Sequence, residues 1–240
     1  MNIDLVRSFE IFIENFDSFM YGVMMTVLFA IVGTVFGLII GLLVSGIRAI
    51  KIEKTDSEPV KVIKKIAELI IRFYIFVFRG TPMMVQAIFF YYFFRDIFHW
   101  THLEAGLLII AINTGAYMAE IIRSGIGAID KGQKEASRSL GLSNVQTLLY
   151  VILPQAIRNS FPSIGNQLIV NIKDSSMLNV LPITELFFQT TSIAGSNMQY
   201  IETYLITALL YLLLTSLASL ALNLFERKMG LAKGHVEMCS

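Results

Sequence analysis

Two charged residues of opposite sign stand at the edges of stretches that otherwise carry no charge. Arg79 comes directly before the 15 uncharged residues Gly80–Phe94, and Asp174 follows the 14 uncharged residues Asn159–Ile172, with Lys173 between. A guanidinium offers a planar pair of N–H donors to a carboxylate, and a carboxylate offers a counter-charge to a cation. Such charges inside a membrane are costly and by default indicate function. The alternative is a structural ion pair between Arg79 and Asp174.

Asp174 belongs to a polar stripe on one face of an expected helix. The stripe consists of Ser163, Gln167, Asn171 and Asp174, at intervals of four, four and three residues. Pro162 suits the first turn of that helix. With a rise of about 1.5 Å per residue, Asp174 then lies about 18 Å from the start, near the middle of a bilayer. We therefore expect Gln167, Asn171 and Asp174 to line a binding site.

Arg79 is followed by a predicted break in its helix. Proline lacks a backbone donor and disfavours helix at the residue before it, so Gly80-Thr81-Pro82 should interrupt the helix. If the helix starts near Leu69, Arg79 lies roughly 15 Å deep. Broken helices at membrane depth line cavities, and transporter sites are often built on them. The polar side chains expected at the same site are Thr81, Gln86 and Asn113.

Glu120 lies in the next apolar segment, and Arg123 follows three residues later. Residues three apart share a face of a helix, so these two side chains either pair with each other or serve the same site. The sequence leaves the roles of Glu120 and Lys173 open.

The composition indicates what kind of protein positions these residues. The chain has 240 residues, of which 55% are hydrophobic and only 15% charged, with a mean hydropathy of +0.66. Soluble domains contain about one quarter charged residues, so an ordinary soluble domain is excluded. A net charge of +1 gives no basis for nucleic-acid binding, and a single cysteine, Cys239, excludes a disulfide framework and a thiolate metal site. We expect an all-α integral membrane protein with no metal site and no cofactor of its own.

Five transmembrane helices follow from the spacing of the charges. A helix needs roughly 20 mostly apolar residues to cross a bilayer. The 30 uncharged residues 18–47 and the 23 uncharged residues 203–225 each suffice, whereas three middle segments become long enough only with the charge beside them. The expected spans are about 19–47, 69–95, 103–124, 161–181 and 203–225, within one transmembrane domain that covers 18–226.

Small residues in the first span predict close helix packing. They are Ala30, Gly33, Gly37, Gly41 and Ser45, spaced three or four apart. This spacing lines one face and lets another helix approach closely.

The basic residues predict the orientation, because loops rich in Lys and Arg stay in the cytoplasm. The segments after spans one and three and the tail 227–240 are basic, whereas 1–17 carries four acidic residues and one arginine. We therefore expect the N-terminus outside and the C-terminus in the cytoplasm. Apolar residues in 1–17 recur as in an amphipathic helix that lies in the outer interface.

The segment 127–157 is too long for a simple turn, and it is expected on the cytoplasmic side. Its pattern predicts two short helices, Gly132–Leu140 and Ser143–Ile152, with Gly141 ending the first and Ser143 capping the second. A helical hairpin at this place is expected to bind a partner. The alternative is a surface loop that lies on lipid.

Four motifs in this chain resemble a known family. Glu135-Ala136-Ser137, Gly141 and Val151-Ile152-Leu153-Pro154 together resemble the EAA loop of bacterial ABC importer permeases, with Ser137 and Val151 as departures from the usual pattern. Three further stretches resemble the polar amino acid branch: Arg79-Gly80-Thr81-Pro82 with Val85-Gln86, Ala116–Glu120 with Arg123, and Lys173–Ser176. The resemblance extends from Gly22 to Phe225.

The resemblance implies a type I ABC importer permease fold in the bacterial cytoplasmic membrane. It implies a second permease subunit (identical or homologous), two ATPase subunits that bind ATP and Mg²⁺, and an extracytoplasmic amino-acid-binding protein. The residues implied in coupling the ATPase to alternating access are Gly132, Glu135, Ala136, Gly141, Leu153 and Pro154. A free amino acid is a zwitterion, so Arg79 would bind its carboxylate and Asp174 its ammonium.

Other functions fit the sequence less well. An ion-coupled secondary amino acid transporter would use Glu120 and Asp174 to carry protons, but an odd number of spans disfavours inverted repeats and the hairpin would have no purpose. An intramembrane enzyme is disfavoured because HExxH and GxSxG motifs are absent. A sensor subunit without transport stays open, as do the identity of the amino acid, homodimer or heterodimer, and whether this subunit itself holds a substrate site.

Overall fold

The computed structural model describes residues 4–50 and 56–230, and every regular element in that part is helical. The long helices are α2 (Phe16–Ala49), α3 (Glu58–Gly80), α5 (His102–Gly127), α8 (Leu153–Asp174) and α10 (Tyr200–Lys228). The shorter elements are α1 (Leu5–Glu14), α4 (Met83–Phe98), α6 (Lys131–Ser139), α7 (Asn144–Thr147), the π-helical turn η1 (Leu148–Ile152), the 3₁₀ helix η2 (Ser175–Val180) and α9 (Leu186–Asn197). The predictions for residues 1–3 and 231–240 lie outside the described residues.

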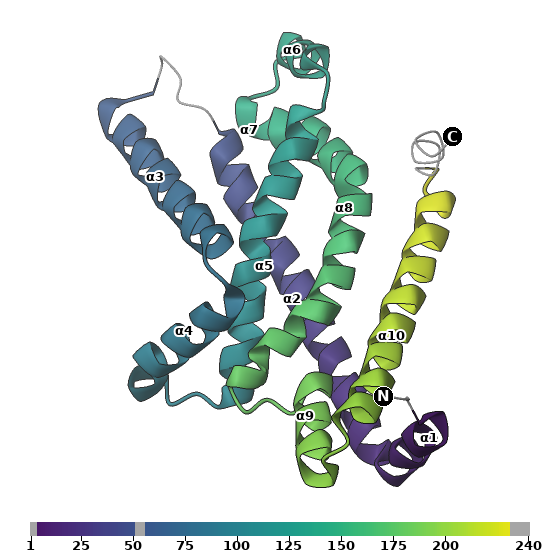
Figure 1. The fold of residues 1–240 in the computed structure, drawn as a ribbon. Coiled ribbons are helices and arrows are strands. Elements are labelled where there is room, and N and C mark those ends of the chain that lie inside the picture. Colours follow the sequence, from purple (N-terminus) through teal and green to yellow (C-terminus); the bar gives the residue numbers. More distant parts are fainter. Residues whose placement is uncertain (1–3, 51–55, 231–240) are drawn as a thin grey trace.

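The helices extend between two ends of the molecule (Figure 1). α1 and α9 lie at one end and α6 and α7 at the other, and we call these the α1 end and the α6 end. Within the described part of the chain, α2, α5 and α10 are long and apolar enough to cross a membrane. α1 and the last turn of α10 lie at opposite ends, as an odd number of crossings requires. The all-α membrane fold is thus confirmed, while the count of five spans stays a prediction.

The small residues of α2 pack against α5. Those that are buried include Gly33, Gly37, Gly41 and Ser45. A Cβ atom added at Gly37 would lie 2.6 Å from Thr114 Cγ2, so the two helices touch here without room for a side chain. Ser45 Oγ donates a hydrogen bond of 2.7 Å to the carbonyl oxygen of Ala119. The close packing predicted from the spacing of the small residues is therefore confirmed.

Gly41→Ala is expected to lower the free energy of unfolding by about 2 kcal/mol, through overpacking. The added Cβ would lie 2.5 Å from Met118 Cβ and 2.9 Å from the backbone nitrogen of Ala119, and backbone cannot move aside cheaply. Gly46→Ala on the same helix is the matched control, because nothing lies within 4 Å of its added Cβ. Thermal unfolding in detergent measures both variants. Equal unfolding midpoints for the two would contradict this packing.

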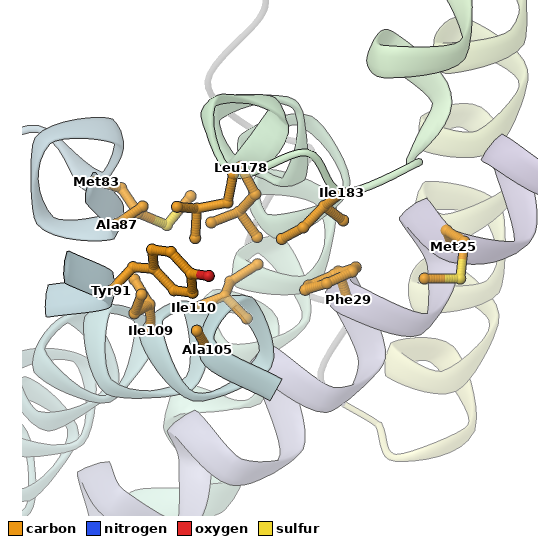
Figure 2. Packing of buried hydrophobic residues seen from close by; sticks show 11 residues of the cluster. Met25, Phe29, Met83, Ala87, Tyr91, Ala105, Ile109, Ile110, Leu178 and Ile183 are labelled. Atoms are coloured by element: carbon orange, nitrogen blue, oxygen red, sulfur yellow. The ribbon is translucent and has the colours of Figure 1, made fainter. Parts of the chain in front are cut away.

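A buried apolar cluster joins α2, α4, α5 and the segment after α8 (Figure 2). Met83, Ala87 and Tyr91 of α4 pack with residues of α5 that include Ile109, and Leu178 of η2 belongs to the same cluster. Packing of this kind is the main force between helices in a membrane, since lipid tails are as apolar as the side chains. The cluster therefore fixes α4 against α5 and η2.

The helix break that the sequence predicts lies between α3 and α4. α3 ends at Gly80, and α4 begins at Met83. Thr81 and Pro82 have extended backbone, with ψ values of 147° and 136°. The two helices leave the break in different directions (Figure 1). α3 itself begins at Glu58, earlier than the expected start of the span near residue 69.

α8 begins earlier than expected. It starts at Leu153 with Pro154 in its first turn, so the prediction that Pro162 begins this helix was wrong. Pro162 lies inside α8, where it removes one backbone hydrogen bond but leaves the helix continuous. Proline did not identify the start of α8 because Pro154 and Pro162 both suit the first turn of a helix. Only Pro154 lies where α8 follows directly on η1. α9 lies in a segment for which no helix was predicted.

The helical hairpin predicted within 127–157 is present. Asp130 caps α6, and its carboxylate accepts the Gly132 N–H at 2.7 Å. Gly141 has a φ of +84°, in the left-handed region that glycine adopts without strain, and so ends the helix. Ser143 and Gln146 form a capping box at the start of α7. The second helix does not stop at Ile152 but continues through η1 into α8.

Candidate functional site

Two buried amide side chains hold the end of α3 at its break. Gln86 Nε2 lies 2.9 Å from the carbonyl oxygen and 2.8 Å from the hydroxyl of Thr81. Asn113 Nδ2 donates to Gln86 Oε1 at 2.9 Å and to the carbonyl oxygen of Phe78 at 3.2 Å. These bonds satisfy carbonyl groups that the break leaves without helical partners. The predicted residues Thr81, Gln86 and Asn113 are thus brought together beside Arg79, and direct contact of the amides with a substrate stays a prediction.

Arg79 reaches from this break into an open cavity of about 480 Å³. The cavity lies between α3, α5 and α8, and its polar lining includes Arg79, Tyr117, Glu120, Arg123, Asn159 and Ser163. The side chain of Arg79 is 44% exposed, and its guanidinium carbon lies 5.4 Å from the centre of the Tyr117 ring, a cation–π contact. Among the described residues it donates no hydrogen bond. Its N–H donors are therefore available to a carboxylate.

Glu120 is the carboxylate of this cavity. Its Oε2 accepts from Arg123 Nε at 2.9 Å and Nη2 at 2.8 Å, which confirms that the two residues pair. Its Oε1 lies 2.6 Å from Arg48 Nη1, and Arg79 Nη1 lies 3.9 Å from its Oε2. Glu120 therefore faces three guanidinium groups from α2, α3 and α5.

The middle of the polar stripe on α8 ties three helices together. Asn171 is 1% exposed, and its Oδ1 accepts from Thr114 Oγ1 of α5 at 3.0 Å. Its Nδ2 donates to Thr34 Oγ1 of α2 at 2.9 Å, and Gln167 Nε2 lies 3.3 Å from its Oδ1. Buried polar networks that are satisfied in this way fix helix positions. Gln167 and Asn171 thus have a structural role here, and their contact with a substrate stays a prediction.

Asp174 lies at the last residue of α8 and is half-buried. Over residues 4–50 and 56–230 it makes no ion pair, so Arg79 and Asp174 do not form the structural pair that the sequence left as an alternative. The α8 residues that line the Arg79 cavity, Asn159, Ser160 and Ser163, precede Asp174 by 11 residues or more. At about 1.5 Å per residue, this is roughly 16 Å along the helix.

Nearly the whole surface of α6 is exposed. Of its nine residues, Ser137 is the buried one, so Gly132, Glu135 and Ala136 are all exposed. Leu140, which caps the helix, is 84% exposed although it is apolar. Leu153 and Pro154, the other two residues of this motif, form the first turn of α8.

Two residues of this architecture were not predicted. Arg48 is one of the basic residues that follow the first span and predict the orientation, and its contact with Glu120 was not predicted. Glu185 is fully buried and accepts from the N–H groups of Phe187 and Phe188 at 2.9 and 2.7 Å and from the Tyr211 hydroxyl at 3.0 Å. Burial raises the pKa of the Glu185 carboxyl, and these donors oppose the shift. Glu185 is an acidic residue in a segment without Lys or Arg, and this feature of the sequence could have indicated that it caps α9.

The comparison with known proteins agrees with these features. Residues 61–231 match the family described as "Binding-protein-dependent transport system inner membrane component". The chain is 35% identical to the probable amino-acid permease protein YxeN of Bacillus subtilis over 225 residues, which is 92% of this chain and 95% of that protein. It is 40% identical to the glutamine transport system permease protein GlnP of Escherichia coli over 159 residues, 65% of this chain and 73% of that protein.

Solved structures give the same result. The crystal structure of an amino acid ABC transporter with histidines superposes with a TM-score of 0.79 at 34% identity, covering 95% of this chain and all of that chain. The methionine ABC transporter MetNI has the same fold, with a TM-score of 0.75 at 21% identity over 90% of this chain and 98% of that one. The chain therefore belongs to the family of inner-membrane permease components of binding-protein-dependent ABC transport systems, and within that family it is one of the amino-acid permeases.

Proposed function

We propose that this chain is the transmembrane subunit of an ATP-driven importer that moves polar amino acids across the bacterial cytoplasmic membrane by alternating access. The observation that carries the proposal is Arg79, a guanidinium with free donors in a cavity at a broken helix. A carboxylate is the natural partner of such a planar fork, and every free amino acid has one. The related GlnP is described as the permease protein of a glutamine transport system, which makes L-glutamine the first amino acid to test.

The second half of the proposed site is Asp174, as the partner of the substrate ammonium. Asn113 joins α5 to α3 at Phe78, and the next residue of α5, Thr114, joins it to α8 at Asn171. Arg79 directly follows Phe78 in the chain, and Asp174 follows Asn171 by about one turn. The backbone positions of Arg79 and Asp174 thus flank the same part of α5, which supports a site shared by the two side chains.

The α6 end is the proposed docking surface for the ATPase. α6 is exposed apart from Ser137 and ends in Leu140, which a protein partner would cover. ATP and Mg²⁺ are bound by the ATPase subunits, so this chain is not itself an enzyme. On this proposal the α6 end faces the cytoplasm and the α1 end faces the binding protein. The five spans are α2, α3 with α4, α5, α8 and α10, and a second permease subunit completes the pathway.

Reconstitution tests the proposal against its alternative, an ion-coupled secondary transporter. The permease is placed in liposomes with its ATPase subunit and binding protein, and uptake of radiolabelled L-glutamine and then of other polar amino acids is followed. We expect uptake that requires ATP and the ATPase subunit and that continues in the presence of a protonophore. Uptake without ATP that a protonophore stops would identify the secondary transporter instead.

A further inference from the structure

The group of charged side chains around Glu120, which extends from the cavity beside Arg79 to Arg48, contains more positive than negative charge. Arg48, Arg79 and Arg123 all face Glu120, and across residues 4–50 and 56–230 none of the three has another carboxylate partner. One carboxylate therefore serves three guanidinium groups, which leaves two positive charges in excess. Arginine stays protonated at any physiological pH, so this excess is permanent.

The two oxygens of Glu120 have different partners. Oε1 is held by Arg48 at 2.6 Å in the more buried part of the cluster, where the side chains are 22% and 19% exposed. Oε2 is shared by the two arginines that line the cavity. Arg123, which is 54% exposed, binds this oxygen directly, while Arg79 lies at 3.9 Å, beyond hydrogen-bond distance. Arg48 therefore anchors the carboxylate, and its other oxygen serves the open side.

The direction of the Arg79 side chain fits this arrangement. Asn113 contacts the backbone at Phe78, next to Arg79, whereas the Arg79 guanidinium reaches Tyr117 and Glu120, one to two turns further along α5 toward the α6 end. Side chains of a helix point toward its N-terminus, and α3 begins at the α6 end. The Arg79 guanidinium thus lies beside Glu120, toward the α6 end and away from the part of α8 that carries Asp174.

We infer that Glu120 is a positioning residue that competes with the substrate carboxylate for Arg79 and Arg123. This inference rests on the proposed function, in which Arg79 binds that carboxylate. A bound amino acid offers Arg79 two oxygens, where Glu120 offers a share of one at 3.9 Å. When the substrate leaves, Glu120 takes the two arginines back. The competition weakens substrate binding, which a transporter needs because a tightly held substrate would not be released.

Substituting Glu120 and its anchor should change substrate affinity in opposite directions. Glu120→Gln removes the competing charge, so the permease–ATPase complex in nanodiscs, without binding protein, should bind radiolabelled L-glutamine about tenfold more tightly. Arg48→Gln frees Glu120 to pair with the cavity arginines, so binding should weaken. In the uptake assay Glu120→Gln should lower both the KM and the maximal rate, since tighter binding slows release. Glu120→Asp, which keeps the charge, should stay close to wild type.

A purely structural role for Glu120 predicts a different result. Both Glu120→Gln and Arg48→Gln remove the 2.6 Å pair, so both would then lower stability and activity together, and neither would tighten binding. Unchanged or weaker binding by Glu120→Gln, while Arg79→Ala loses binding, would overturn this inference and leave the proposed function intact. Wild-type binding by Arg79→Ala would overturn both. If Glu120→Gln does not fold, Arg48→Gln decides: weaker L-glutamine binding at the wild-type unfolding midpoint supports the competition. Weaker binding with a lowered midpoint, or unchanged or tighter binding, contradicts it.

Discussion

Arg79→Ala should weaken L-glutamine binding to the permease–ATPase complex about 30-fold or more and abolish ATP-driven uptake. Removing one partner of a hydrogen-bonded charge pair costs roughly 2–5 kcal/mol, and here the other partner is the substrate carboxylate. Equilibrium binding in nanodiscs measures the effect. The fold should survive, because Arg79 is 44% exposed and makes no hydrogen bond to the described residues.

Arg79→Lys is the matched control for charge. Lysine keeps the positive charge but loses the planar fork, so its affinity should lie between those of wild type and Arg79→Ala. The thermal unfolding midpoint of all three proteins should agree closely. A variant without charge at this position that still binds L-glutamine like wild type would show that the carboxylate binds elsewhere.

Leu140→Asp should abolish ATP-driven uptake while leaving L-glutamine binding unchanged. Leu140 is 84% exposed at the end of α6, and on the proposed function it is buried against the ATPase subunit. A charge at an apolar anchor of an interface costs about 2 kcal/mol or more, which is at least a 30-fold loss of affinity for the partner. Copurification of the ATPase subunit measures the loss of the partner, uptake into liposomes measures transport, and L-glutamine binding is measured on the permease alone in nanodiscs.

Leu140→Met is the matched control, because it changes the residue but keeps an apolar side chain at the proposed interface. Methionine is apolar and of similar volume, so ATPase binding and uptake should stay within about twofold of wild type. Full uptake by Leu140→Asp would mean that the ATPase does not bind this part of α6.

Backbone features of this fold follow directly from local sequence. The small residues of α2 predicted that another helix packs closely on it, because a helix face without large side chains lets a neighbouring helix approach. The break at Thr81-Pro82, the turn at Gly141 and the cap at Ser143 likewise depend on residues next to them in the chain. The start of α8 was missed for the same reason, since Pro154 and Pro162 give the same local signal.

The partners of polar side chains were harder to predict. The sequence placed Gln86, Asn113 and Asn171 at membrane depth, yet nothing in it showed that Gln86 and Asn113 bond the end of α3 or that Asn171 joins α2 and α5. Gln86 reaches Thr81 and Phe78, five and eight residues back, only because the helix breaks between them. The other contacts join residues 27 to 137 positions apart, where no periodicity applies. The pairing of Glu120 with Arg123 was accessible because it lies within one turn of a helix, and that with Arg48 was not.

On the proposed function Arg79 and Asp174 bind the two charges of one amino acid, and a cycle of ligands and variants measures each of these contacts. Binding of L-glutamine is compared with that of 4-aminobutanamide, which lacks the α-carboxylate, and of glutaramate, which lacks the α-ammonium. The three compounds are tested on wild type, Arg79→Ala and Asp174→Asn in nanodiscs. If a variant and a ligand change remove the same contact, their losses of binding free energy do not add. Losses of binding free energy from independent contacts do add.

If the two side chains bind these charges, two pairs of losses in binding free energy should not add. Arg79→Ala should weaken L-glutamine strongly but should not further weaken 4-aminobutanamide, and Asp174→Asn should weaken L-glutamine but not glutaramate. If each variant instead weakens all three compounds by the same factor, neither side chain binds a charge of the substrate, and the proposed site is wrong.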